Sequence, residues 1–228
     1  MSAATRIPEA EGLDVVLVGS FNPAIFHPEW FFRQGIVSEQ DAKEAKVQDV
    51  SGEITIVQMC GILIQCVSDR FSLLTTNISH AERMQDLIRQ TFSLLTHTPI
   101  TACGINPHVH YSVGNVDYWH KIGHELAPKE PVWNELLEHP GMQSLTIKAP
   151  RSRGDYPGEI NATVEPSGKH PPGIFVKVNY HYGLPTEVVH VGAAELALKF
   201  IEAEWKPACG MARKVAEQIF TKIKPDHD

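Results

Sequence analysis

The chain has 228 residues, 43% of them hydrophobic. It is long enough for one core without disulfides or metal, and because no linker-like Gly, Ser or Pro run divides it, we expect a single domain over residues 1–228. A formal net charge of −7 argues against nucleic-acid binding, which needs a basic surface. No apolar run approaches the ~20 residues of a membrane span, and four cysteines without CxxC spacing indicate free thiols in a reducing cytoplasm.

The first elements predicted along the chain are a strand and two short helices. Residues 1–12 are polar and are expected to fray. Residues 14–21 are rich in β-branched residues and apolar at both parities, which is typical of a strand covered on both faces. Pro28 suits the first turn of a short helix, and Ser38 opens a capping box for a second one.

Three more strands and a long helix complete the first half of the chain. The strands are predicted at residues 53–58, 62–67 and 71–75. A capping box at Ser79 precedes apolar residues at helical spacing, so we expect an amphipathic helix that ends near Pro99.

The second half repeats this order of elements. A strand is predicted over residues 100–113, and two short helices over 116–126 and 131–138 are each stopped by a proline. Three alternating strands follow, centred on the segments 145–147, 160–164 and 174–182. A long helix over roughly residues 191–223 closes the chain, and Pro207 should kink it because proline lacks the backbone donor.

The shared order of elements indicates an internal duplication with repeats at 13–99 and 100–228. Residues 21–27 and 105–110 also share a local Asn-Pro pattern. We therefore expect an α+β fold in which two similar β-α-β-β-β-α halves form one antiparallel curved sheet with long helices packed on one face. This element order resembles that of TATA-binding-protein-like and helix-grip folds.

Polar side chains gather on one predicted face of the second-half strands, where they would meet water or a partner. Alternation places on that face Asn106, His108, His110, Ser112, Glu159, Asn161, Thr163, Glu165, Lys177, Asn179 and His181. Asn22 and His27 belong to the matching segment of the first half. The candidate binding residues are therefore Asn22, His27, Asn106, His108, His110, Asn179 and His181.

Histidine spacing leaves a metal site open as an alternative. His108 and His110 lie two apart on a strand and could bind a metal together with His181, although such pairs are common on solvated strands. His120 and His124 are four apart on a predicted helix but do not form an H-E-x-x-H motif. Cys103 is better explained by packing than by catalysis. Because there is no G-x-S-x-G motif and no Gly-rich phosphate loop, we expect no cofactor.

Three segments resemble a family of uncharacterised bacterial proteins of about this length: FNPAIFHPEW, FSLLTHTPITACGIN and LAPKEPVWNELLEHPGMQSLTI. The resemblance covers nearly the whole chain and supplies no catalytic residues. It implies a bacterial, cytoplasmic, single-domain protein that works beside partners.

The sequence thus favours a non-enzymatic binding or assembly protein. It would contact a protein partner through the polar sheet face or through strand edges, and the apolar first-half strands could support a homodimer. One alternative is a metal-dependent hydrolase or lyase using His108, His110 and His181. Another is a small-molecule carrier with its ligand between the last helix and the sheet.

Overall fold

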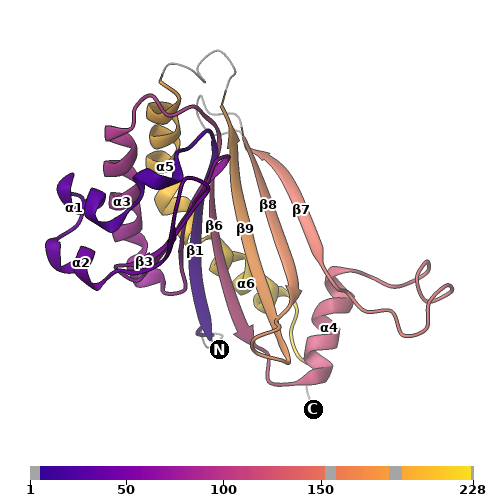
Figure 1. The fold of residues 1–228 in the computed structure, drawn as a ribbon. Coiled ribbons are helices and arrows are strands. Elements are labelled where there is room, and N and C mark those ends of the chain that lie inside the picture. The colour runs from indigo at the N-terminus through magenta and orange to yellow at the C-terminus, as the bar shows by residue number, and fades with distance from the viewer. Residues whose placement is uncertain (1–5, 152–157, 185–191, 227–228) are drawn as a thin grey trace.

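One curved, unclosed antiparallel sheet of nine strands organises the computed structural model, which describes residues 6–151, 158–184 and 192–226 (Figure 1). The strands are β1 (Ala10–Gly19), β2 (Lys46–Val50), β3 (Ile54–Met59), β4 (Ile62–Val67), β5 (Arg70–Thr75), β6 (Ile100–Ser112), β7 (Leu145–Arg151), β8 (Gly158–Pro166) and β9 (Gly173–Gly183). Their order across the sheet is β2-β3-β4-β5-β1-β6-β9-β8-β7. The two leading strands, β1 and β6, therefore lie side by side at the centre.

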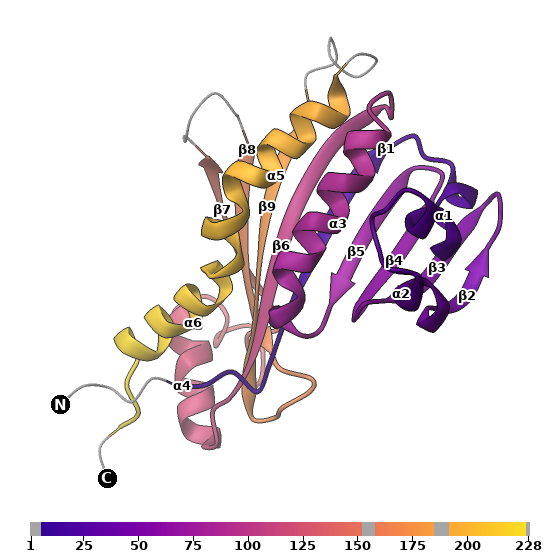
Figure 2. The ribbon, with the colours of Figure 1, turned by 90° about the vertical axis from the view of Figure 1, so that its left-hand side faces the viewer.

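The long helices lie together on one face of this sheet (Figure 2). The helical segments are η1 (Pro23–Ile25), α1 (Pro28–Arg33), α2 (Glu39–Glu44), η2 (Ile78–His80), α3 (Ala81–Leu94), α4 (Val116–Leu126), α5 (Ala193–Cys209) and α6 (Met211–Lys222). Aromatic contacts join the layers: the rings of Tyr182 and Phe200 stack at 4.9 Å, and those of Tyr111 and Phe220 meet edge-on at 5.3 Å. None of the described helices is both long and apolar enough to cross a membrane.

Period-2 alternation in the central strands separates the core from the opposite face. In β1, Leu13, Val15 and Leu17 are fully buried under the helices. Val16 and Val18 point the other way and remain half-buried. The expectation that this strand is covered on both faces is therefore wrong, because no described helix lies over its second face.

The predicted fold class is confirmed: the protein is α+β, with one antiparallel curved sheet and helices packed on it. Each half contributes one central strand, β1 or β6, which pairs with the last strand of its own meander, β5 or β9. The first half has the additional edge strand β2. The duplication itself stays a prediction.

Two local predictions about chain segments are wrong. Residues 1–5 lie outside the described residues, but Ala10 already pairs with His110 in the sheet, so the N-terminal segment is ordered before residue 12. The helix predicted over 131–138 does not form, and this segment adopts turns. Its apolar side chains find no surface to pack on, and eight residues cannot sustain an isolated helix in water.

The C-terminal helix is interrupted later than Pro207 predicts. The chain remains helical from Ala193 to Cys209, passes through Gly210 and continues as α6. Pro207 lacks a backbone donor, which weakens the turn before it. Gly210 has low helix propensity, so the helix is interrupted at this glycine, three residues after the proline. The predicted start at residue 191 lies outside the described residues.

The expected capping box at Ser79 is also wrong. Ser79 lies within η2, where its backbone N–H donates to the side chain of Asn77 at 3.0 Å. Helix α3 then begins at Ala81 without a side-chain cap.

Candidate functional site

The sheet face opposite α3, α5 and α6, here called the open face, contains a hollow of about 600 Å³. This trough is lined by residues of six neighbouring strands, from β4 through β5, β1, β6 and β9 to β8. Its volume is in the range of ligand-binding sites. The trough is therefore a candidate contact surface.

A row of polar side chains crosses the trough because neighbouring strands hold them in register. Asp14 of β1 lies opposite Asn106 of β6, and Asn179 of β9 lies opposite Asn161 of β8. The Asn179 amide donates to Asn106 Oδ1 at 2.5 Å, and the Asn161 amide donates to Asn179 Oδ1 at 3.3 Å. We call these three asparagines the amide row. Each carboxamide can make up to four hydrogen bonds, so the row keeps capacity for a ligand.

Asp14 ends this row with a partly buried carboxylate, whose side chain is 19% exposed. Its Oδ1 has no hydrogen-bond partner among the described residues and lies 4.0 Å from His108 Nδ1, while Oδ2 lies 3.7 Å from the Lys177 ammonium. Burial raises the pKa of Asp14, opposed by His108 and Lys177. Burial likewise lowers the pKa of His108, opposed by Asp14. Burial thus opposes the charged forms of both side chains, while their mutual attraction favours those forms.

A glycine gives the His108 ring its position. A Cβ on Gly12, the residue opposite His108, would lie 2.5 Å from the ring atom Nε2 and 2.4 Å from the Thr75 carbonyl oxygen. Real Cβ atoms do not approach other atoms so closely. The absence of a side chain at Gly12 therefore leaves the space that the imidazole occupies, 4.0 Å from the Asp14 carboxylate.

His110 occupies a structural position. Its Nδ1 lies 2.9 Å from the Ser167 hydroxyl, its ring centre is 4.6 Å from that of Phe175, and it is only 7% exposed. Burial, with a smaller contribution from Lys169, lowers the pKa of His110 to about 4. A ring held in this way has little freedom to bind a ligand.

The predicted histidine metal site is not assembled. His108 lies opposite Lys177 on β9, whereas His181 lies four residues further along that strand, opposite Gly104. At about 3.3 Å per residue, this separates the two histidines by roughly 13 Å. Within the described ranges, no three His, Cys, Asp or Glu side chains come together in a group that could hold a metal ion.

Asn22 and His27 lie at helix starts on the helical side of the molecule, away from the trough. The Asn22 side chain accepts a hydrogen bond from the backbone N–H of Ala24 at 3.2 Å and caps η1. His27 Nδ1 accepts from the backbone N–H of Glu29 at 3.2 Å and caps α1. The structure therefore gives both residues a role in helix capping, and their role in binding stays a prediction.

No protein-family model matches the chain, and no curated protein matches it. The resemblance to a bacterial family therefore stays a prediction, and the site must be interpreted from its own residues. Of those predicted, the structure places Asn106, Asn179 and His181 in the trough, with His108 against Asp14 at its edge.

Sequence reasoning missed Asp14, which is central to the site. The available signal was a single acidic residue inside the apolar run 14–21, at the parity opposite to Leu13 and Val15. Cys103, by contrast, points into the core, where burial raises the pKa of its thiol far above the ordinary value. That environment suits a packing role and not a nucleophile.

Proposed function

We propose that this protein is a non-enzymatic binding protein that holds an extended segment of a protein partner in the trough. One observation carries the proposal: Asp14 lines the uncovered polar trough, and its buried Oδ1 atom has no hydrogen-bond partner among the described residues. Buried polar atoms in native proteins nearly always have partners. The exception at Asp14 therefore supports a bound partner that supplies the missing hydrogen bond.

The two sides of the trough suit a peptide segment. The amide row on β6, β9 and β8 offers donors and acceptors together, as a peptide backbone does. On the other side, Val16, Val18 and Leu74 offer a half-buried apolar floor. An extended chain presents its side chains to opposite faces, so it could place apolar groups on this floor and backbone groups against the amides.

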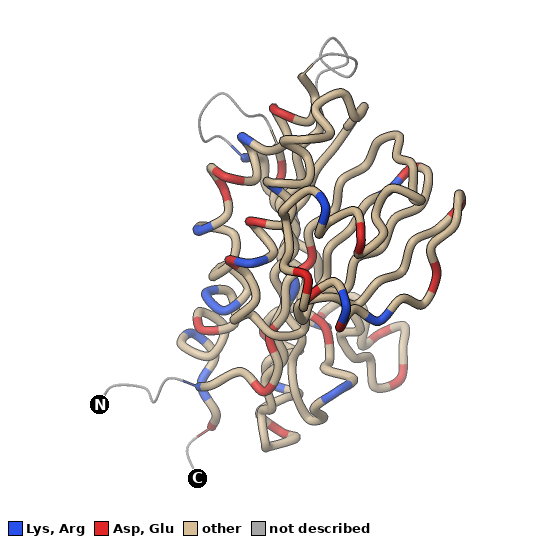
Figure 3. The backbone as a smooth tube through the Cα atoms, turned by 60° about the vertical axis from the view of Figure 1, so that its left-hand side comes forward, with Lys and Arg blue, Asp and Glu red and all other residues tan. Residues whose placement is uncertain are grey.

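Other functions have less support from the geometry. The contact between the last helices and the sheet is filled by stacked rings such as Tyr182 and Phe200, which disfavours a carrier with its ligand there. The separation of His108 from His181 disfavours the metal-dependent hydrolase or lyase. Lys and Arg positions are interspersed with Asp and Glu positions over the helical layer (Figure 3), which favours a protein partner over nucleic acid.

Site-specific photo-crosslinking in the cells that make the protein tests this proposal. A photoreactive residue at Thr163 in the trough should give an adduct with one defined partner, and mass spectrometry should locate the contact in a short segment. The same residue at Glu82, exposed on α3, serves as the control. Adding Ser72→Trp, which fills the trough, should abolish the adduct. Identical adducts at both positions, or no protein adduct at Thr163 in a folded variant, would refute the proposal.

A further inference from the structure

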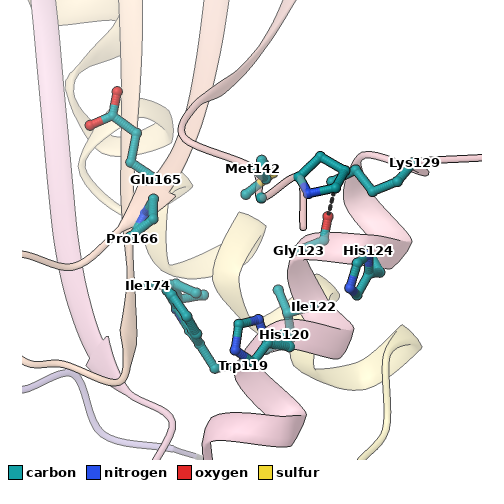
Figure 4. A pocket seen from close by; sticks show the side chains of 12 residues that line it. Trp119, His120, Ile122, Gly123, His124, Lys129, Met142, Glu165, Pro166 and Ile174 are labelled. Carbon is teal, nitrogen blue, oxygen red and sulfur yellow. Dashed lines mark hydrogen bonds between the residues drawn. The ribbon is translucent and has the colours of Figure 1, made fainter. Parts of the chain in front are cut away.

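A crevice and the trough differ in size and in the state of their cations. The crevice, between α4 and the ends of β8 and β9, holds only about 80 Å³ (Figure 4). The one lysine or arginine in its described lining is Lys129, which donates to the carbonyl oxygens of Gly123, at 3.0 Å, and Ala127. The crevice therefore offers neither the length for an extended segment nor a free lysine or arginine.

The trough, by contrast, is lined by an arginine that the rest of the chain leaves unpaired. This is Arg70 of β5, which has no charged or aromatic partner among the described residues. The other arginines that the structure describes are all engaged. Arg6 lies over the rings of Tyr118 and Phe220. The rest pair with carboxylates, and they are Arg33, Arg83, Arg89, Arg151 and Arg213.

The sheet around Arg70 does not compensate its charge. The residue is exposed and lies opposite Val18 on β1 and Val67 on β4, neither of which is charged. Asp14 lies opposite Leu74, four residues along β5 from Arg70. At about 3.3 Å per residue this separation is roughly 13 Å. An unpaired guanidinium in a chain with a formal net charge of −7 is therefore suited to a carboxylate from outside, which it can bind through two parallel hydrogen bonds.

The lysine of the trough is in a different state. The Lys177 ammonium lies 3.7 Å from Asp14 Oδ2, so this charge already has a carboxylate close by. Lys177 is on β9, three strands away from β5, which is about 14 Å across the sheet. One carboxylate cannot reach both cations. Arg70 is therefore the cation that the trough presents to an anionic group.

An apolar floor continues from Arg70 along β1. Val18 lies opposite Arg70, and Val16 is the next residue of β1 on the open face. Gly104 lies opposite Val16 on β6 and adds no side chain there. Side chains of an extended segment that face the sheet recur at every second residue, as those of β1 do. A segment along β1 can therefore place one side chain beside Arg70 and another, two residues away, over Val16.

We propose, on the basis of the function proposed above, that the segment held in the trough carries an acidic side chain that pairs with Arg70. An apolar residue two positions away packs on Val16. The acidic group compensates the arginine while the apolar group covers the floor. A neutral or basic segment would instead cover the guanidinium without compensating its charge, which is costly.

Photo-crosslinking in the cells that make the protein tests the position of the segment. A photoreactive residue at Gln65, which lies opposite Ser72 on the Arg70 side of the trough, should give an adduct with the same partner as one at Thr163. Mass spectrometry should locate the Gln65 contact in a segment that contains an acidic residue and an apolar residue two positions from it.

A synthetic fluorescent peptide of the cross-linked segment then tests the charge, by fluorescence anisotropy with the purified full chain. Arg70→Gln should weaken binding about 10-fold and Arg70→Glu about 100-fold, because the reversal adds repulsion to the lost ion pair. Arg89→Glu is the matched control. It makes the same change of charge on α3, on the other side of the sheet, and should change the Kd by less than about 3-fold.

A charge exchange separates recognition from structural effects. Replacing the acidic residue of the peptide by arginine should weaken its binding to the wild type and restore most of the affinity for Arg70→Glu. Circular dichroism checks that each variant is folded, and Arg70→Gln keeps the test open if the charge reversal prevents folding.

The outcomes distinguish this inference from the proposed function. An adduct at Thr163 but not at Gln65, a cross-linked segment without an acidic residue, equal affinity of Arg70→Gln and wild type, or a charge exchange that restores no binding would overturn the pairing with Arg70. Each of these leaves partner binding in the trough intact. The absence of a protein adduct at both Thr163 and Gln65 in folded variants would remove the proposed function, and the pairing with it.

Discussion

Replacing Asp14 by asparagine should make the folded protein more stable at neutral pH, although it alters the centre of the candidate site. The carboxylate is partly buried, and its buried Oδ1 atom has no hydrogen-bond partner among the described residues. Because burial raises the pKa of Asp14, the folded protein disfavours the charged form relative to the unfolded chain. Asparagine keeps the shape of the side chain and removes this charge.

The magnitude follows from two opposing contributions. A buried charged group with an unsatisfied oxygen costs about 1–3 kcal/mol. The contact between Asp14 and Lys177 is long, at 3.7 Å, and the lysine is 42% exposed, so losing it removes less than about 1 kcal/mol. We therefore expect Asp14→Asn to raise the free energy of unfolding by about 1 kcal/mol near pH 7.5.

The pH dependence of this gain has a definite sign. Since the folded-state pKa of Asp14 lies above the ordinary value of 3.8, the folded protein takes up this proton before the unfolded chain does. The wild type is therefore relieved of the penalty as the pH falls through the folded pKa. The advantage of Asp14→Asn should be largest at neutral pH and should shrink as the pH approaches about 4.

Urea unfolding of both proteins, followed by circular dichroism at several pH values, measures this difference. Asp86→Asn is the matched control, since Asp86 is 58% exposed on α3 and paired with Arg89. It should change the unfolding free energy by less than about 0.5 kcal/mol. A loss of more than about 1 kcal/mol in Asp14→Asn at neutral pH would show that the carboxylate stabilises the fold, and our reasoning would fail.

Three further substitutions test the packing and electrostatics around the sheet. Gly12→Ala should lower the unfolding free energy in urea by about 2 kcal/mol, because the new Cβ would clash with the His108 ring and a neighbouring carbonyl; an unchanged midpoint would contradict this. The pKa of His110 is lowered to about 4 because burial disfavours the charged imidazole. The unfolded chain therefore takes up this proton first, and the free energy of unfolding should fall by up to about 2 kcal/mol as the pH drops from about 6.5 towards 4. His110→Gln should make the free energy of unfolding less dependent on pH in this range. Glu204→Ala strands the buried Arg151 guanidinium, to which Glu204 is bonded at 2.6 Å, and should cost about 3–5 kcal/mol in thermal or urea unfolding. Adding Arg151→Met should recover most of the loss.

Periodicity predicts the fold class and the two faces of the sheet but not the distances along it. The parity of His108 and His181 correctly places both on the open face. Whether two residues on different strands meet depends on register, which is set by turn geometry and by packing against distant elements. The chain between β6 and β9 includes the helix α4, the loop 127–144 and the strands β7 and β8, so no local pattern fixes that register. The metal hypothesis fails for this reason.

Asn22 and His27 show that a local sequence pattern can have a simple structural explanation. Each is followed directly by a proline, Pro23 or Pro28, which starts a helix. An Asn before an N-terminal proline is the usual signature of a helix cap, and capping explains these residues without a ligand. The similarity between residues 21–27 and 105–110 favours a binding role for the same two residues, and that role stays a prediction.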